Sequence, residues 1–249
     1  GLGDVYKRQR KSNKSVIERI HQMEQNQKDY REYIESWVHE IKAPITAIAL
    51  NCENNRDERS RYLLVENRKV ENYVDMALYY ARMDAVYKDY MIAETNLQEV
   101  AQQVLLQNKY YLIQSHVKAE VACPDTVYSD KKWIAFILNQ LIQNSVKYGR
   151  SEGAHIQIVT EKTKSGVLLR VKDDGIGIPK EELTRIFEKG FTGTNGRNRE
   201  RSTGMGLYLC RKLCDKLNIE IRAESAEGKG TEIILMFPVS DYLTGYRET

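Results

Sequence analysis

Long apolar runs are absent from this sequence. No stretch approaches the ~20 apolar residues that a helix needs to cross a bilayer, and no signal peptide is visible. The chain also lacks an initial methionine, and its run Asp4–Gln9 resembles a translated sequencing adapter. We therefore expect residues 1–11 to be non-native or disordered, and the natural N-terminus to be missing together with any membrane segment before it.

Cysteine and net charge are both low. The four cysteines lack the paired spacing of zinc sites, so we expect reduced thiols, as in a cytosolic protein. Lysine and arginine number 38 against 35 aspartates and glutamates, and this balance gives no support for a nucleic-acid partner. A length of 249 residues, 41% of them hydrophobic, indicates one or two globular domains with a sizeable core.

The N-terminal third carries a heptad pattern of apolar residues. It predicts a helix over residues 12–52, a polar turn over 51–57 and a second helix over 58–84. We therefore predict an antiparallel helical hairpin over residues 12–85. One hairpin cannot cover its own apolar stripe, so the pattern predicts a homodimeric four-helix bundle. The stripe of the first helix consists of Val16, Ile20, Met23, Tyr30, Ile34, Val38, Ile41, Ile45 and Ile48.

One histidine lies off this stripe. At ~100° per residue, His39 points about 130° away from the stripe, towards solvent. A lone surface histidine usually has no function, but its neighbours suit a nucleophile. Glu40 can accept a proton from the ring, and Pro44 loosens the next turn by removing a helix hydrogen bond. A zinc protease would need a second histidine at the position of Ala43.

Strands and helices are interspersed in the rest of the chain. This arrangement predicts an α/β sandwich with helices on one face of a sheet, and thus an α+β fold class for the whole chain. We assign residues 86–92 to a linker and residues 93–249 to this second domain. Strands are predicted over residues 90–94, 117–122, 155–163, 167–173, 219–225 and 231–239, and helices over 97–113, 130–148 and 206–217.

The second predicted helix of this domain carries polar residues that suit a nucleotide. Asn139, Asn144 and Lys147 are predicted to be near-neighbours on one face. An amide oxygen suits a hard cation such as Mg²⁺, and a lysine suits a phosphate.

Two further segments contain glycines next to functional groups. Asp173, directly after a strand, can accept from an exocyclic amine such as that of adenine, while Gly175 and Gly177 let the backbone approach a flat ring. Alone this signal is weak, because Asp-Gly turns are common. The run Thr203-Gly204-Met205-Gly206-Leu207 opens a helix, so its free N–H groups and the helix dipole favour phosphate. Leu209 replaces the third glycine of a Rossmann motif, and no Walker A motif occurs.

Two loops remain open to more than one interpretation. Thr231 follows Gly228-Lys229-Gly230. On one interpretation its hydroxyl lines the pocket for the base, and on the other the segment is a plain hairpin turn. The glycine-rich, charged segment 187–201 suits a mobile lid over phosphates. Its basic residues are candidates for phosphate contact or for an ordinary solvated surface; they are Lys189, Arg197, Arg199 and Arg201.

In this order and spacing, the segments resemble those of bacterial sensor histidine kinases of two-component systems, over about residues 12–240. Residues 39–44 resemble the H-box and residues 139–148 the N-box. The two glycine boxes correspond to residues 173–177 and 204–207, and Phe187–Phe191 resembles the F-box. The resemblance implies that residues 93–249 form a Bergerat-fold ATP-binding domain.

The resemblance also implies the role of each residue. His39 would accept the phosphoryl group, with Glu40 as its acid/base partner. Asn144 would hold Mg²⁺ with Asn139 nearby, Lys147 would contact phosphate and Tyr148 would pack near the nucleotide. ATP and Mg²⁺ are thus the implied cofactors, and a response-regulator aspartate the next acceptor. Further contacts with ATP are implied for Asp173, Gly175, Gly177, Ile178, Thr203, Gly204, Met205, Gly206, Leu207 and Thr231.

A subgroup resemblance adds expectations about location. Three stretches are similar to the corresponding stretches of the bacitracin-sensing kinases. They are Trp37-Val38-His39, the Lys-x-Pro at residues 42–44 and the run Ser202–Leu209. These sit in the bacterial membrane and often work with ABC transporters, so we expect a cytoplasmic fragment of an integral membrane protein. Ala43 departs from relatives that carry Thr or Asn there to position water, which predicts weak phosphatase activity.

Two rival functions are weighed against a kinase. One is a related ATPase that uses nucleotide to gate its conformation without phosphorylating itself. The other is a degenerate kinase that serves as a dimeric scaffold. The presence of His39, Asn144 and both glycine segments argues against the scaffold, and the hairpin bearing His39 argues against a chaperone-type ATPase.

Overall fold

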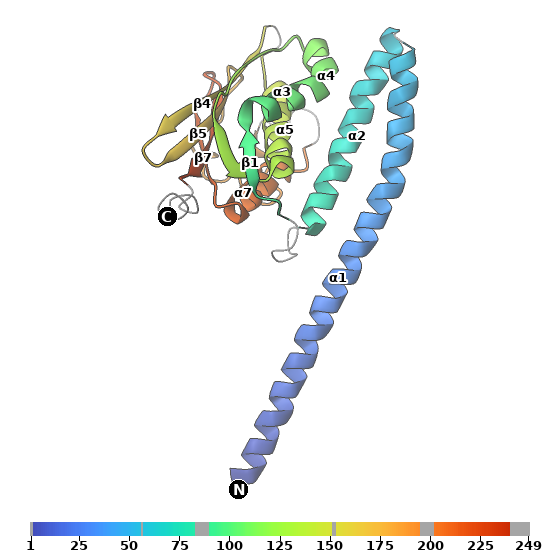
Figure 1. Cartoon of the computed structure of the whole chain (residues 1–249), viewed down its shortest axis with the longest axis vertical. Coiled ribbons are helices and arrows are strands. Elements are labelled where there is room, and N and C mark those ends of the chain that lie inside the picture. The colour runs from blue at the N-terminus through green and yellow to red at the C-terminus, as the bar shows by residue number, and fades with distance from the viewer. Residues whose placement is uncertain (1, 56, 83–89, 151–152, 195–201, 240–249) are drawn as a thin grey trace, which may run out of the picture. The chain divides into compact units, whose positions relative to one another are not determined.

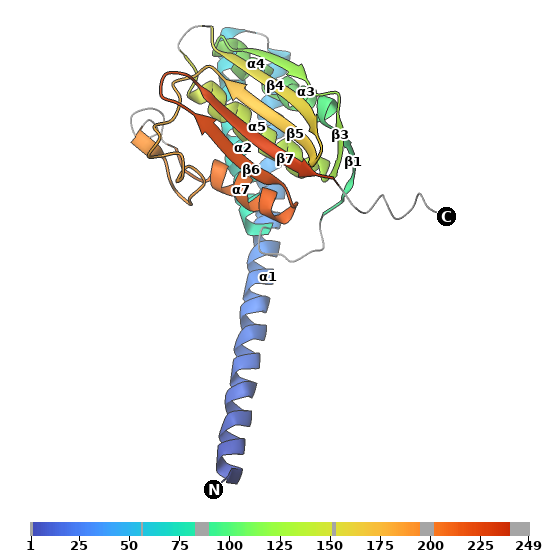
Figure 2. The same ribbon diagram turned by 90° about the vertical axis from the view of Figure 1, so that its left-hand side faces the viewer.

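The chain divides into two units, residues 1–86 and 87–249, shown in Figures 1 and 2. The computed structural model describes residues 2–55, 57–82, 90–150, 153–194 and 202–239, with side chains from residue 14 onward. Most of the linker expected at residues 86–92 lies outside the described residues. Among the helices that are described, none combines the length and apolar character needed to cross a bilayer.

The first unit is the predicted helical hairpin, formed by α1 (Leu2–Asn54) and α2 (Glu58–Arg82). The predicted start of the first helix at Ser12 is wrong, because α1 already begins at Leu2. Residues 2–11 are thus helical rather than disordered, and their lysines, arginines and glutamine have favourable helix propensities. Asp57 caps α2: its Oδ1 accepts from the Ser60 backbone N–H at 2.6 Å, which lowers the pKa of the Asp57 carboxyl.

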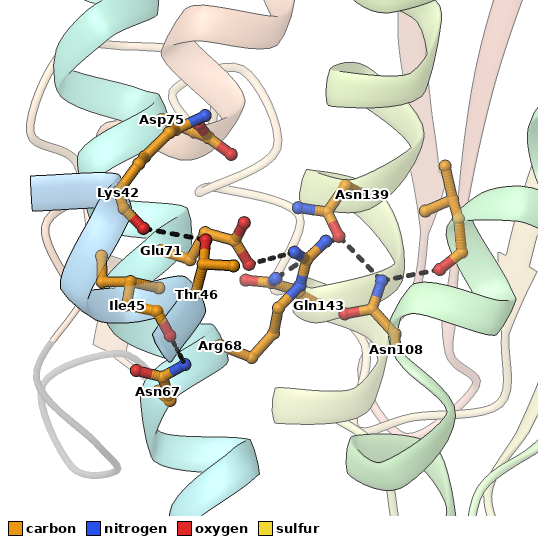
Figure 3. A network of polar contacts seen from close by, with 11 residues as sticks. Lys42, Ile45, Thr46, Asn67, Arg68, Glu71, Asp75, Asn108, Asn139 and Gln143 are labelled. Carbon is orange, nitrogen blue, oxygen red and sulfur yellow. Dashed lines mark hydrogen bonds and ion pairs between the residues drawn. The ribbon is translucent and has the colours of Figure 1, made fainter. Parts of the chain in front are cut away.

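The hairpin has a small core joined by polar contacts. Val38, Ile45 and Val74 are buried, with Ile34, Ile41 and Leu78 packed against them. Lys42 Nζ pairs with Asp75 Oδ1 at 2.7 Å, and Asn67 Nδ2 donates to the Ile45 carbonyl at 2.8 Å (Figure 3). Much of the apolar stripe stays exposed in a single chain, including Val16, Ile20, Met23, Tyr30 and Ile48.

The second unit is an α/β sandwich. Its five-stranded sheet has the order β2-β4-β5-β7-β6, in which β2 and β4 are parallel and the other pairs antiparallel. Strands β1 and β3 form a separate antiparallel pair. Figures 1 and 2 place α3, α5 and α7 on one face of the sheet. The elements are β1 (Ala93–Asn96), α3 (Leu97–Gln107), α4 (Lys109–Gln114), β2 (Lys118–Ala122), β3 (Thr126–Ser129), α5 (Lys131–Lys147), β4 (His155–Thr163), β5 (Gly166–Asp173), α7 (Gly206–Lys216), β6 (Glu220–Ser225) and β7 (Thr231–Pro238).

The core of this unit lies between the sheet and the helices. Alternate strand residues face the helices, because successive side chains of a strand point to opposite faces. They meet the apolar face of α5, which is buried over most of its length. The three cysteines of this unit, Cys123, Cys210 and Cys214, are buried as free thiols, as is Cys52 of α1. The core includes Ile156, Ile158, Leu169, Val171, Ile233 and Leu235 from the strands and Ile134, Ile137, Leu138, Leu141 and Ile142 from α5.

Two predicted elements of this unit need correction, and one strand was missed. The single helix predicted over residues 97–113 is broken at Asn108, whose side chain bonds the Val104 carbonyl and a residue of α5. This side chain competes with the backbone for hydrogen bonds and ends the helix. The strand predicted at residues 90–94 lies at Ala93–Asn96, and its partner Thr126–Ser129 was not predicted. Both strands have four residues, too few to show a period.

Candidate nucleotide site

His39 lies on the solvent side of α1, as its angular position predicted. Both His39 and Glu40 are exposed, while the adjacent Val38 belongs to the hairpin core. Pro44 sits inside the helix and cannot donate a backbone hydrogen bond. In the same turn the hydroxyl of Thr46 donates to the Lys42 carbonyl at 2.8 Å (Figure 3).

In the second unit, polar contacts converge on Asp173 at the end of β5. Its Oδ1 accepts from the backbone N–H groups of Gly175 at 3.0 Å and Thr231 at 3.1 Å. Its Oδ2 accepts from the hydroxyl of Ser145 on α5 at 3.0 Å. Burial raises the pKa of the Asp173 carboxyl, and these three hydrogen bonds oppose that shift.

Glycines allow the backbone to close around this carboxylate. Gly230 has φ +87°, and a Cβ there would lie 2.0 Å from the Asp173 carbonyl oxygen. Gly177 has φ +70°, and its Cβ would lie 2.0 Å from the Ala226 carbonyl oxygen. Both positions therefore require glycine, so the glycines of these two segments serve close backbone contacts.

Ser225, at the end of β6, joins the same two segments. Its Oγ accepts from the Ile178 backbone N–H at 2.9 Å and donates to the Gly230 carbonyl at 2.7 Å. It also lies 3.0 Å from the hydroxyl of Thr231. Sequence reasoning missed Ser225, since a serine at a strand end carries no signal before its partners are known.

Asn139, Asn144 and Lys147 were predicted to be near-neighbours on one face of α5, but the amide of Asn139 is engaged elsewhere. Asn139 Oδ1 accepts from Asn108 Nδ2 at 2.8 Å, so this amide oxygen is engaged at the break between α3 and α4 (Figure 3). Asn144 is half-buried. The residue one turn before Asn144 is Gln140, because positions four apart are neighbours on a helix. The spacing itself could have identified it.

Gln140 meets the beginning of α7. Its Oε1 lies 2.8 Å from the position that a Cβ on Gly206 would take. Its Nε2 is buried and has no hydrogen-bond partner among the described residues. The Gln140 amide therefore lies beside the predicted phosphate segment, next to Asn144 on α5.

The end of α5 meets the same segment through a serine. Lys147 Nζ donates to Ser202 Oγ at 3.1 Å, and the Tyr148 hydroxyl lies 3.1 Å from the same oxygen. The predicted phosphate-contacting lysine and the predicted nucleotide-packing tyrosine thus meet at Ser202, which sequence reasoning did not single out.

Helix α7 presents an uncapped N-terminus. Met205 occupies the N-cap and makes no side-chain capping hydrogen bond. The preceding Gly204 has φ +64° and accepts from the Gly190 backbone N–H at 3.0 Å. This contact anchors the described part of the predicted lid. Arg197, Arg199 and Arg201 lie outside the described residues.

The four predicted segments thus come together in one place. Gly175, Gly177 and Thr231 surround the half-buried carboxylate of Asp173, and α5 links this group to the start of α7. The arrangement offers an acceptor for an amine at one end. At the other end it offers helix N–H groups, amides and a lysine suited to phosphate.

Comparisons with known proteins agree with this geometry. Residues 129–241 match the family model described as histidine kinase-, DNA gyrase B- and HSP90-like ATPase. The sensor histidine kinase YxdK of Bacillus subtilis is 31% identical over 238 residues, covering 94% of this chain and 73% of YxdK. The sensor protein kinase GraS of Staphylococcus aureus is 35% identical over 218 residues, covering 85% of this chain and 62% of GraS.

Solved structures of the histidine kinase ThkA share the fold. Its catalytic domain matches with a TM-score of 0.52 and 26% identity, over 59% of this chain and 95% of that domain. ThkA in complex with the response regulator TrrA matches with a TM-score of 0.55 and 23% identity, over 81% of this chain and 59% of ThkA. The sandwich is therefore a Bergerat-type ATPase fold, as predicted.

Proposed function

This chain belongs to the bacterial sensor histidine kinases, and we propose that it transfers the γ-phosphoryl group of ATP to His39 and then to an aspartate of a response regulator. The observation that carries the proposal is the convergence of the nucleotide segments on Asp173 and on the start of α7. ThkA, which shares the fold, is known in complex with a response regulator.

In the proposed reaction, a ring nitrogen of neutral His39 attacks the γ-phosphorus in line. A nitrogen–phosphorus bond forms while the bond to the β,γ-bridging oxygen breaks and ADP leaves. Glu40 accepts the proton from the imidazole. Both side chains are exposed on α1, so a nucleotide carried by another domain can reach them. The phosphoryl group then passes from nitrogen to the carboxylate oxygen of the regulator.

The donor groups at the phosphate end fit Mg²⁺. Asn144 presents an amide oxygen, a hard ligand that Mg²⁺ accepts together with phosphate oxygens and water. When bound, Mg²⁺ neutralises charge that develops on the phosphates. Lys147 supplies a positive charge at the same end of α5, and Asp173 orients the base at the other.

Incubation of the chain with Mg²⁺ and γ-labelled ATP tests the proposal. We expect acid-labile label on the parent, none on His39→Gln and strongly reduced label on Asn144→Ala. His21→Gln is the matched control, because His21 is also an exposed histidine of α1. Label that survives in His39→Gln, or nucleotide binding without any labelled histidine, would contradict the kinase proposal and favour one of the two rivals.

We also propose that the chain acts as a homodimer. The exposed residues of the α1 stripe and Leu63 and Val70 of α2 are apolar, and a second hairpin would cover them. The chain spans 62% of the length of GraS. We propose that the full-length protein is membrane-anchored, while an ABC-transporter partner stays a prediction from the subgroup resemblance.

We expect weak phosphatase activity because of the side chains in the helical turns after His39. Ala43 has no side-chain hydrogen-bonding group, and the hydroxyl of Thr46 already donates to the Lys42 carbonyl. Neither residue therefore offers a free side-chain donor to water, as Thr or Asn would at position 43. We expect Ala43→Thr to accelerate dephosphorylation of the regulator. An unchanged rate would count against this assignment.

A further inference from the structure

Ser145 is a polar residue in the core-facing part of α5. Its side chain is only 5% exposed, and its hydroxyl donates to Asp173 Oδ2 at 3.0 Å. A buried hydroxyl normally needs a hydrogen-bond partner. Here the partner is the carboxylate proposed to recognise the base, which gives Ser145 a direct influence on that group.

The donors around Asp173, Ser145 among them, leave its carboxylate one free acceptor position. An ionised carboxylate has about four lone-pair positions, two on each oxygen. Backbone N–H groups of Gly175 and Thr231 occupy both positions of Oδ1, and Ser145 occupies one of Oδ2. One acceptor position remains, on Oδ2. A single N–H of an exocyclic amine fills it.

These three hydrogen bonds also favour the ionised form. Hydrogen bonds to a charged acceptor are stronger than those to a neutral one, so they oppose protonation of the half-buried carboxyl. Two of the donors are backbone N–H groups, which no substitution other than proline removes. Ser145 is therefore the one side chain among these donors that tunes Asp173.

We propose that Ser145 is a specificity-determining positioning residue, which keeps Asp173 a pure acceptor and thereby selects adenine over guanine. Adenine carries an amine at the ring position where guanine carries a carbonyl oxygen. An ionised Asp173 accepts from that amine but faces the guanine oxygen with a second acceptor, which leaves both unpaired. A protonated Asp173 can donate to the oxygen, so discrimination depends on ionisation. The inference rests on the proposed function, since it requires a nucleotide at this site.

Among the described residues, few charged groups lie close enough to the Asp173 carboxylate to change its pKa. Asp174, on its own segment, raises the pKa of Asp173 by repulsion, although burial is the larger cause. On the neighbouring strand β4, the His155 ring is directed to Glu120 at 3.3 Å. The groups that contact Asp173 from α5 and β7 are the neutral Ser145 hydroxyl and Thr231 N–H. Removal of the Ser145 hydroxyl should therefore act mainly through Asp173.

The test is nucleotide affinity as a function of pH, measured on the full chain with ATP and with GTP. We expect Ser145→Ala to weaken ATP binding about 3- to 10-fold at neutral pH, the range of one net hydrogen bond. We expect the loss of ATP binding on acidification to begin at higher pH, and the preference for ATP over GTP to fall. Ser145→Thr keeps a hydroxyl and should restore the pH profile.

Two controls make the result decisive. Ser165→Ala removes an exposed hydroxyl in the turn between β4 and β5 and should match the parent. Asp173→Ala should abolish ATP binding. If Asp173→Ala abolishes binding but Ser145→Ala retains the parent's pH profile and ATP preference, the inference is overturned while the proposed function stands. If Asp173→Ala binds ATP normally, the nucleotide site itself is wrong.

Discussion

The two units of this chain differ in how completely they bury their own apolar residues. In the sandwich, strand and helix residues such as Ile137, Ile158 and Leu169 are fully buried within one chain. Among the side chains described in the hairpin, five apolar ones are buried, namely Val38, Ile45, Cys52, Val65 and Val74, and much of the stripe is exposed. A sheet covered by helices closes its core, whereas two helices leave one side of each stripe open.

This difference suggests what each unit depends on. The sandwich should owe its stability to its own core, so its unfolding should not depend on protein concentration. The hairpin should gain stability from a second copy, and its unfolding should shift with concentration. Substitutions in each unit test this contrast.

Ile137→Ala should destabilise the sandwich by about 2–5 kcal/mol, the usual cost of removing a fully buried large aliphatic side chain. Ile137 is completely buried on α5, whereas Ile113 of α4 is 69% exposed. Ile113→Ala is therefore the control and should change little. Urea unfolding monitored at two protein concentrations measures both. A loss that varied with concentration would contradict a self-sufficient sandwich.

Gly230→Ala should destabilise the sandwich more than Gly228→Ala and should weaken ATP binding. Both glycines have positive φ, +87° and +74°, so both alanines carry backbone strain of about 1–3 kcal/mol. Only the Cβ at Gly230 would also strike the Asp173 carbonyl, at 2.0 Å, while nothing lies within 4 Å of one at Gly228. Thermal unfolding and ATP titration compare the pair. Equal effects would show that the contact is unimportant.

Ile48→Ala should weaken the proposed dimer by about tenfold, because burial of a large aliphatic side chain contributes ~1.5–3 kcal/mol and alanine keeps part of it. Leu50→Ala is the control: Leu50 is similarly exposed, 57% against 47%, but lies about 200° around α1 from Ile48. Sedimentation equilibrium gives the two dissociation constants. Equal shifts would mean that the stripe is not the interface.

Asp75→Asn should have the smallest effect, about 0.2–1 kcal/mol, because its ion pair with Lys42 is partly exposed. The loss should shrink as salt is added, since screening weakens such pairs. Glu32→Gln, which removes an exposed pair with Lys28 within α1, should cost still less. Thermal unfolding at low and high salt measures both. A salt-independent loss would indicate a packing role instead.

Local patterns account for most of what was predicted correctly. The heptad steps predicted both hairpin helices, and the angular position of His39 predicted its exposure. In the second unit, α3 begins at Leu97 as predicted, and Asn96 caps it by accepting from the Glu99 N–H at 3.1 Å. Strands β4 and β5 lie close to the ranges predicted for them, 155–163 and 167–173, and pair as an antiparallel hairpin. Each of these features depends on residues close together in the sequence.

Features that depend on distant partners were missed or misplaced. Helical spacing alone favoured Asn139, but that residue is bonded to Asn108, and Gln140 lies beside the start of α7. Ser145, Ser202 and Ser225 have no local signal, although each contacts a residue of a predicted segment. The positions of such partners depend on how strands and helices pack.

The family resemblance, the hairpin, the solvent-facing histidine and the four nucleotide segments are all readable from the amino-acid sequence, because periodicity and motif spacing are local properties. The pairing of β1 with β3, the break at Asn108 and the donors around Asp173 emerge only in the folded chain. Buried polar groups must find partners, and folding alone brings residues as distant as Ser145, Asp173 and Thr231 within hydrogen-bond reach.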